Sequence, residues 1–165
     1  MREGPGTSRF AGRAGSHQER LNMVPIGVKR LHPNAILPRY SHDGEFGDLA
    51  ADLYSVEELT FTKGDIKAIS IGIALEFPAG YGGMIADRSG LAMKGITTFA
   101  GVIDPGYRGE LKVVAAYFGA VPLQINVGDR VAQLRIVKRI AGVFTEIDDL
   151  GISERSDRGF GSSGS

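Results

Sequence analysis

The sequence predicts an all-β domain. From position 69 to 77, Ile, Leu and Phe alternate with small or polar residues, and this period of two is typical of a strand with one buried face. Other short apolar runs are separated by turn signals such as Lys63-Gly64 and Ala79-Gly80, and no long segment has helical periodicity. Together with the 24 glycines, many short strands at even spacing predict a sandwich or a barrel.

The expected strands follow one another in order, with turn residues between them. They cover residues 26–30, 69–77, 84–86, 111–118, 123–125 and 131–136. One short helix is expected to begin at Ser89, because Ser is a favoured N-cap residue and residues 91–94 are good helix formers. Gly95 can end this helix in a left-handed conformation.

Length and charge balance indicate one domain that does not bind a polyanion. A chain of 165 residues buries enough surface for a core of its own. The 19 Lys and Arg residues balance 19 Asp and Glu residues, which points to neither nucleic acid nor an anionic membrane as a partner. Because the chain has no cysteine, disulfides and thiolate metal sites are excluded, and we expect a cytoplasmic protein. No apolar run approaches the roughly 20 residues needed to cross a bilayer.

The two ends of the chain differ in composition from its middle. Residues 1–22 are rich in Gly, Ser and Arg without hydrophobic periodicity, so we expect a disordered extension, which we hypothesise to be non-native or misannotated. Met23 begins the first apolar stretch, and the domain is expected to span residues 23–150. Gly and Ser dominate residues 151–165, which predicts a flexible tail.

The segment 101–111 concentrates candidate chemistry at one predicted turn. Pro105 and Gly106 suit the two central positions of a type II turn, which predicts a tight hairpin. Asp104 lies at the mouth of this hairpin, opposite Tyr107, where partial desolvation would make its carboxylate a better proton acceptor. The alternative is an ordinary hairpin whose Asp only caps its own turn.

Four further segments accompany this one. In chain order the five segments are 47–55 (GDLAADLYS), 87–95 (DRSGLAMKG), 101–111 (GVIDPGYRGEL), 128–134 (GDRVAQL) and 154–164 (ERSDRGFGSSG). In order and spacing they resemble the five motifs of the trimeric dUTPase family, over about residues 25–164. The resemblance implies a jelly-roll-like, distorted β-barrel of the dUTPase-like β-clip type. It also implies a homotrimer in which each active site takes motifs from all three subunits.

The resemblance implies hydrolysis of dUTP to dUMP and pyrophosphate, which limits uracil incorporation into DNA and supplies dUMP for dTMP synthesis. Asp104 matches the family's catalytic Asp, which activates a water that attacks the α-phosphorus. Tyr107 matches the Tyr that packs beneath deoxyribose and leaves no room for a 2′-hydroxyl. Main-chain groups of the hairpin are expected to read the uracil edge. The candidates are Thr98, Val102 and Ile103, with Lys112 on the returning strand as a further nucleotide contact.

The second and fourth motifs match the family's phosphate-binding residues, which here are Arg88, Ser89, Gly90 and Gln133. Free N–H groups at the start of a helix attract phosphate, and Arg88 adds a permanent cation with bidentate geometry. Taken alone, the Arg88 segment also fits a capped helix, and Gln133 also fits a cross-strand hydrogen bond.

The resemblance implies Mg²⁺ as the cofactor. Asp52 matches the acid that contacts the hydrated ion, which the substrate's triphosphate mainly holds. Because Mg²⁺ keeps several waters and binds through few carboxylates, no His or Asp cluster is needed. His17, His32 and His42 are scattered along the sequence and are expected to be structural or exposed.

The C-terminal tail matches a lid that crosses to a neighbouring subunit and closes over bound nucleotide. Arg155 is expected to contact the γ-phosphate and Phe160 to stack on uracil, with Gly161 beside it in the substrate-binding set. As a bare sequence feature, the tail also fits a disordered terminus.

Three departures from the family pattern stand out, and the first two are expected to weaken or reshape the site. Asp87 stands where the family often has Pro, and Ala50-Ala51 replace a Gly-aromatic pair. Residues 156–158 (SDR) fill lid positions that are commonly glycine-rich, and they are expected to stiffen the lid or to add a phosphate contact through Arg158. None of these changes removes a residue that has a chemical role.

Two other functions fit parts of the pattern. A dCTP deaminase shares the fold and a similar Ile-Asp-Pro-Gly hairpin, but it needs a Glu on the returning strand where this chain has Val114. A nucleotide-binding regulator without turnover is the second rival, although Asp104, Arg155 and Phe160 are all present. The sequence therefore favours dUTP hydrolysis over both.

Overall fold

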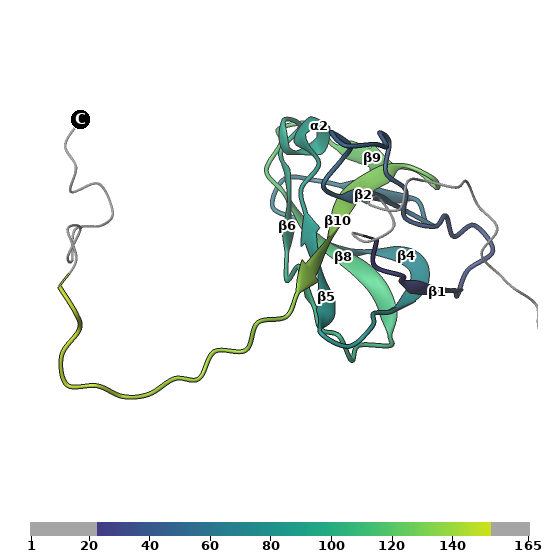
Figure 1. The fold of residues 1–165 in the computed structure, drawn as a ribbon. Helices are drawn as coiled ribbons and strands as arrows, with labels where there is room; N and C mark the ends of the chain where they lie inside the picture. Colours follow the sequence, from purple (N-terminus) through teal and green to yellow (C-terminus); the bar gives the residue numbers. More distant parts are fainter. Residues whose placement is uncertain (1–22, 153–165) are drawn as a thin grey trace, which may run out of the picture.

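A computed structural model describes residues 23–152, and the regular secondary structure in this range is nearly all β (Figure 1). The strands in this range are β1 (Gly27–Arg30), β2 (Ala51–Tyr54), β3 (Leu59–Phe61), β4 (Ile66–Glu76), β5 (Tyr81–Ala86), β6 (Ile96–Phe99), β7 (Val102–Ile103), β8 (Glu110–Tyr117), β9 (Leu123–Ile125) and β10 (Arg130–Lys138). The helix in this range is α2 (Ser89–Ala92). The prediction of an all-β chain with one short helix is confirmed.

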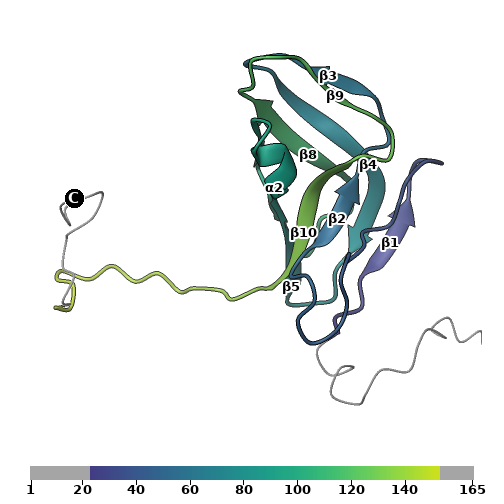
Figure 2. The same ribbon diagram turned by 90° about the horizontal axis from the view of Figure 1, so that it is seen from above.

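The strands form three antiparallel sheets. The first has the order β1-β4-β8-β6, the second has the order β2-β10-β5-β7, and the third pairs β3 with β9. In Figures 1 and 2 the two larger sheets face each other across one interior. Both contribute to its apolar core, for example Ile71 of β4 and Val113 of β8 from the first sheet, and Leu53 of β2 and Leu134 of β10 from the second. This is the expected jelly-roll-like barrel.

β4 follows the sequence pattern most clearly. Ile69, Ile71 and Ile73 are completely buried, as the period of two predicts. The register between β4 and β8 shifts between Ser70 and Ala74. Such an irregularity bends a strand, so β4 can follow the curvature of the barrel.

Four strands lie outside the expected set, namely β2, β3, β6 and β7. Each has only two to four residues, which is too few for an alternating pattern to stand out. Their place in the fold therefore depends on pairing with distant strands.

The expected N-cap of α2 is wrong by one residue. The N-cap is Arg88, whose backbone is extended (φ −92°, ψ 128°), and no side chain caps the helix there. Ser89 is instead the first helical residue, so its N–H belongs to the set that a helix leaves without internal partners. At the other end, Gly95 has a φ of 96° and donates its N–H to the carbonyl of Ala92 at 2.9 Å, as predicted.

The expected hairpin around Pro105 and Gly106 is wrong in its pairing. β7 pairs with β5 in one sheet, whereas β8 pairs with β4 and β6 in the other. The chain does turn where expected, since Tyr107 donates its N–H to the carbonyl of Asp104 at 3.1 Å. Gly106 does not have a positive φ, so the turn is not type II, because glycine permits that conformation without requiring it. The segment therefore crosses from one sheet to the other.

Beyond β10 the chain leaves the barrel. Residues 140–152, the C-terminal arm, form neither helix nor strand and extend away from the sheets (Figure 1). Ile140, Val143, Phe144 and Leu150 on this arm are almost fully exposed. Residues 1–22 and 153–165, which include the expected extension and most of the expected lid, lie outside the described residues. In the described range, none of the helical structure has the length and apolar character that a membrane span requires.

Candidate active site

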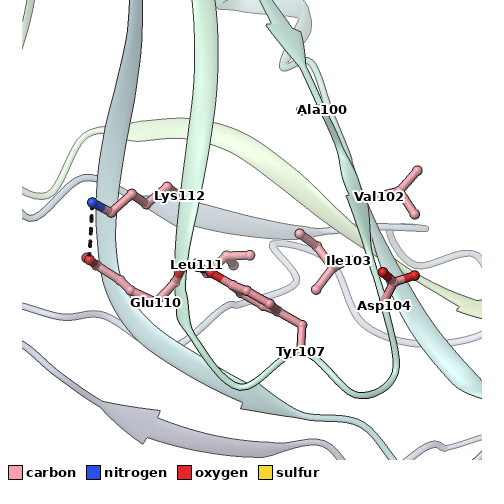
Figure 3. Close-up of a pocket in the computed structure, with 8 residues that line it drawn as sticks. All are labelled: Ala100, Val102, Ile103, Asp104, Tyr107, Glu110, Leu111 and Lys112. Atoms are coloured by element: carbon pink, nitrogen blue, oxygen red, sulfur yellow. Dashed lines mark hydrogen bonds and ion pairs between the residues drawn. The ribbon is translucent and has the colours of Figure 1, made fainter.

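A pocket of about 500 Å³, the crossover pocket, lies where the chain passes from β7 to β8 (Figure 3). Its lining residues are Ala100, Val102, Ile103, Asp104, Tyr107, Glu110, Leu111 and Lys112. Five of these were predicted as catalytic or nucleoside-binding residues, namely Val102, Ile103, Asp104, Tyr107 and Lys112. One local crossover therefore brings together the side chains of the third motif and its returning strand.

Asp104 lies at one side of the crossover pocket and is exposed. The expected partial desolvation by Tyr107 is therefore wrong for the single chain. Among the described residues, none donates a hydrogen bond to its carboxylate, although its carbonyl accepts the N–H that closes the turn. Both carboxylate oxygens are thus available to accept hydrogen bonds from a bound molecule or from water.

Tyr107 is held as a wall of this pocket. Its hydroxyl donates to the carbonyl of Glu110 at 3.0 Å. Gly109 makes this position possible, because a Cβ there would lie 2.5 Å from the phenolic oxygen and 2.7 Å from the ring carbon that carries it. Arg108 fastens the same turn by donating to the carbonyls of Pro105 at 2.8 Å and Tyr107 at 3.0 Å. The sequence analysis did not assign these roles to Gly109 and Arg108, although both lie inside the third motif.

Glu110 and Lys112 form the far wall of the crossover pocket (Figure 3). Their charged groups are 3.7 Å apart, and Glu110 also accepts the N–H of Gly72 from β4 at 3.3 Å. Lys112 keeps about half of its side chain exposed, so its ammonium group can still meet an anion. Glu110 was not among the predicted residues.

A second pocket of about 270 Å³, the arginine pocket, lies between β2, the start of α2 and β10. Its lining residues are Ser41, His42, Asp48, Ala50, Asp52, Arg88, Ser89, Arg130 and Gln133. Four predicted residues meet here, namely Asp52, Arg88, Ser89 and Gln133. The arginine pocket and the crossover pocket have no lining residue in common.

Asp52 is the charged centre of the arginine pocket. Only 7% of the residue is exposed, and its two carboxylate oxygens accept from Arg88 Nε at 2.8 Å and from Arg130 Nη1 at 3.2 Å. The hydroxyl of Ser41 adds a third donor at 3.2 Å. Arg88 is therefore fixed through one edge of its guanidinium group, which leaves other N–H groups for a ligand. Arg130 and Ser41 are site residues that the sequence analysis missed, and the motif 128–134 was the available signal for Arg130.

Gly90 lies in an adjoining pocket of about 350 Å³, which also includes Arg88, Arg130 and Lys94. The N–H groups of Ser89 and Gly90 donate to no other residue in the described part of the chain. The start of α2 therefore presents two backbone donors beside two guanidinium groups, which is a suitable environment for phosphate.

Asp87 and Gln133 are joined by a hydrogen bond just before α2. The side chain of Gln133 donates to the carbonyl of Asp87 at 3.0 Å, which resembles the structural alternative considered for this residue. The Asp87 carboxylate accepts the N–H and the hydroxyl of Thr98, both at 2.7 Å. Desolvation raises the pKa of Asp87, but the hydrogen bonds from Thr98 and Thr97 outweigh it, so the net pKa lies below its ordinary value. Thr98 is not among the lining residues of the crossover pocket, and its N–H already has an acceptor.

The loop before β2 is closed by Asp48, which accepts the N–H groups of Ser41 at 2.8 Å and His42 at 2.9 Å. The backbone hydrogen bond from His42 is the largest cause that lowers the pKa of Asp48. His42 is exposed, as expected, and its ring pairs with Asp48 at 3.1 Å. This closure orients Ser41 toward Asp52.

The structure leaves part of the expected site undescribed. Arg155, Phe160 and Gly161 of the expected lid lie outside the described residues. Between residues 23 and 152, no group of three or more His, Cys, Asp or Glu side chains is arranged to hold a metal ion.

Comparisons with known proteins agree with the five sequence motifs. The dUTPase family model matches residues 35–164. A deoxyuridine 5′-triphosphate nucleotidohydrolase from Solibacter usitatus is 41% identical over 147 residues, which cover 87% of this chain and 99% of the relative. The enzyme of the same name from Thermobifida fusca is 41% identical over 145 residues, covering 86% and 79%. The solved structure of the Staphylococcus bacteriophage 80alpha dUTPase with dUpNHpp has a TM-score of 0.73 and 26% identity, covering 86% of this chain and 99% of the phage chain.

Proposed function

The chain belongs to the dUTPase family and hydrolyses dUTP to dUMP and pyrophosphate, and we propose that Asp104 is its catalytic base. The observation that carries this proposal is the crossover pocket, in which Asp104 and Tyr107 meet the edge strand β7. In this reaction, the Asp104 carboxylate accepts a proton from water while the water oxygen attacks the α-phosphorus. The bond from that phosphorus to the oxygen bridging the β-phosphate breaks, and pyrophosphate leaves.

The other walls of the crossover pocket select the nucleoside. Tyr107 is braced by Glu110 and Gly109, so its ring cannot easily yield to a 2′-hydroxyl, and ribonucleotides are excluded by contact. β7 is the last strand of its sheet, so one of its edges offers unpaired backbone donors and acceptors. Val102 and Ile103 can therefore present main-chain groups to the edge of uracil.

The phosphates occupy the arginine pocket and the start of α2. Arg88, anchored by Asp52, and the free N–H groups of Ser89 and Gly90 supply charge-assisted and backbone donors to phosphate oxygens. Gln133 lies beside them, and Arg130 adds a second guanidinium group that the same carboxylate orients.

Mg²⁺ fits this site as an ion carried by the triphosphate and not by a protein cage. Asp52 already accepts from Arg88, Arg130 and Ser41, so direct ligation of a metal would displace one of these donors. A contact from Asp52 to a water of the ion agrees with the preference of Mg²⁺ for keeping its waters. When bound, Mg²⁺ would neutralise phosphate charge as pyrophosphate leaves.

We infer that the complete site is shared between copies of the chain in a homotrimer. The crossover pocket and the arginine pocket have no lining residue in common, although one dUTP must reach both. The exposed apolar side chains of the C-terminal arm also suit burial against a neighbouring copy. Arg155 and Phe160 of the following tail would then close the neighbour's site over the γ-phosphate and uracil.

Product analysis tests this function against its rivals. With Mg²⁺ present, dUTP should give dUMP and pyrophosphate, whereas dCTP and UTP should remain largely unchanged. Release of ammonia from dCTP would indicate deamination, although Val114 of β8 offers no acid–base group for it. Tight binding of dUTP without any product would indicate a regulator.

A further inference from the structure

We infer that Asp87 is a positioning residue that fastens the base of the loop 88–95, an inference that rests on the proposed function. Its Oδ1 accepts from the N–H and the hydroxyl of Thr98, both at 2.7 Å. Its Oδ2 accepts from the hydroxyl of Thr97 at 3.0 Å. Three donors on one carboxylate hold the two ends of the loop together.

The position of Asp87 makes this fastening effective. Asp87 directly follows β5 in one sheet, whereas Thr97 and Thr98 belong to β6 in the other sheet. The carbonyl of Asp87 also accepts from Gln133 of β10 at 3.0 Å. One residue thus links the end of β5 to β6 and to β10 at the point where the loop begins.

The loop 88–95 carries the groups proposed to bind phosphate. Arg88 follows Asp87 immediately, and the N–H groups of Ser89 and Gly90 come next. Apart from its own hydrogen bonds, this part of the loop is held by the guanidinium contacts of Arg88 with Asp52 at 2.8 Å and with the carbonyl of Arg130 at 3.4 Å. If Asp87 released the loop base, the backbone donors would need to be ordered when the triphosphate binds, which costs affinity.

Asp87 should act on the phosphates more than on the nucleoside. Neither Asp87 nor Thr97 lines the crossover pocket. Among the described residues, neither of them makes a hydrogen bond to Asp104 or Tyr107. The Asp87 carboxylate points toward β6, where the hydroxyl groups of Thr97 and Thr98 donate to it. Its removal should therefore change the preference for triphosphate over monophosphate and leave the nucleoside contacts intact.

The experiment compares Asp87→Ala and Asp87→Asn with the control Asp65→Ala. Asp65 is a matched control because it also accepts a Thr N–H and hydroxyl, from Thr62 at 2.8 and 3.1 Å, but outside both pockets. For each variant, we would measure KM and kcat for dUTP, the affinities for non-hydrolysable dUpNHpp and for dUMP, and the melting temperature.

Asp87→Ala should raise KM for dUTP and weaken dUpNHpp binding by about five- to tenfold, while dUMP affinity and kcat change by less than about twofold. Asp87→Asn should fall between wild type and Asp87→Ala, since its amide oxygen still accepts hydrogen bonds. Thr97→Val, which removes one donor, should shift the dUpNHpp to dUMP affinity ratio in the same direction. Asp65→Ala should lower the melting temperature without changing that ratio.

An unchanged ratio of dUpNHpp to dUMP affinity in folded Asp87 variants would overturn the positioning role, whether both affinities fall equally or neither falls. If Asp87→Ala does not fold, Asp87→Asn and Thr97→Val give the same decision. Failure of the proposed function is a separate result, because it requires that the wild-type protein release no pyrophosphate from dUTP.

Discussion

The Asp104 carboxylate is available for chemistry because the hydrogen bonds that hold its turn do not involve this carboxylate. Arg108 and the backbone of Tyr107 fasten the turn, and no described residue donates to the Asp104 side chain. A base that is bound by its own protein would need to break those bonds before it could accept a proton. The geometry of the turn therefore keeps the proposed base separate from the hydrogen bonds that support the turn.

Asp104→Asn should keep the fold and the affinity for dUpNHpp but lose most turnover. The amide has nearly the same shape and cannot act as a base, so kcat should fall by about 10²–10⁴-fold. Steady-state kinetics and a binding titration on the same preparation would check this. Near-normal kcat would assign activation of the water to another group.

Gly109→Ala should reduce the discrimination between dUTP and UTP with little loss of stability. The added Cβ would lie 2.5 Å from the Tyr107 hydroxyl, and the ring can move away because this atom is the far end of a side chain. The displaced ring would no longer exclude a 2′-hydroxyl as strictly. The measurement is the ratio of kcat/KM for dUTP and UTP, with thermal unfolding as the control. An unchanged ratio would remove Tyr107 from the selection of deoxyribose.

At the scale of elements, local turns are stabilised by carboxylates that accept from their own loop. Between β3 and β4, Asp65 accepts from the N–H and hydroxyl of Thr62 and pairs with Lys67 at 2.8 Å. The hydrogen bond from Lys67 is the largest cause that lowers the pKa of Asp65 from 3.8 to about 2. At a pH between these two pKa values, Asp65 is protonated in the unfolded chain and ionised in the folded chain.

Asp65→Asn should therefore lower the melting temperature at neutral pH by more than at low pH. The lowered pKa gives stability that is fully present above about pH 4 and is lost as the pH falls through about 2. The difference in melting temperature between wild type and variant should be constant near neutral pH and shrink across this window. A difference that grows as the pH falls would contradict the assignment.

The sequence predicted elements whose signal is local. The alternation of Ile69, Ile71 and Ile73 predicted the long buried strand β4, and Gly95 predicted the end of α2. The pairing of β7 with β5 was not predictable in this way, because a turn signal does not say which strands pair on either side of it. The β6 partners of Asp87 were missed for a related reason, since β6 is too short to show a period.

At the scale of the whole molecule, the sequence named candidate site residues but not the contacts between them. Resemblance to known motifs named Asp52, Arg88 and Gln133, and the arginine pocket contains all three. The ion pairs that join Asp52 to Arg88 and Arg130 span 36 and 78 residues of sequence, so local patterns could not reveal them. The exposure of Asp104 was also missed, because desolvation depends on what covers the pocket.

The proposed division of the site between two pockets accounts for the exposure of Asp104 in the single chain. The crossover pocket contains the proposed base, the arginine pocket contains the proposed phosphate donors, and the two pockets share no lining residue. A homotrimer in which one copy's crossover pocket faces its neighbour's arginine pocket would complete the site and cover Asp104. The central claim is therefore that Asp104 and Arg88 of different chains act on the same dUTP.

Mixing two inactive variants tests this claim most directly. Asp104→Asn and Arg88→Ala would be refolded separately and together at equal concentrations, with light scattering to confirm that each preparation contains three chains. Because hybrid trimers include sites with an intact Asp104 from one chain and an intact Arg88 from another, the mixture should regain about a quarter of wild-type turnover. Hybrid trimers that form but stay as inactive as the separate variants would show that both residues act from the same chain, and would contradict the account.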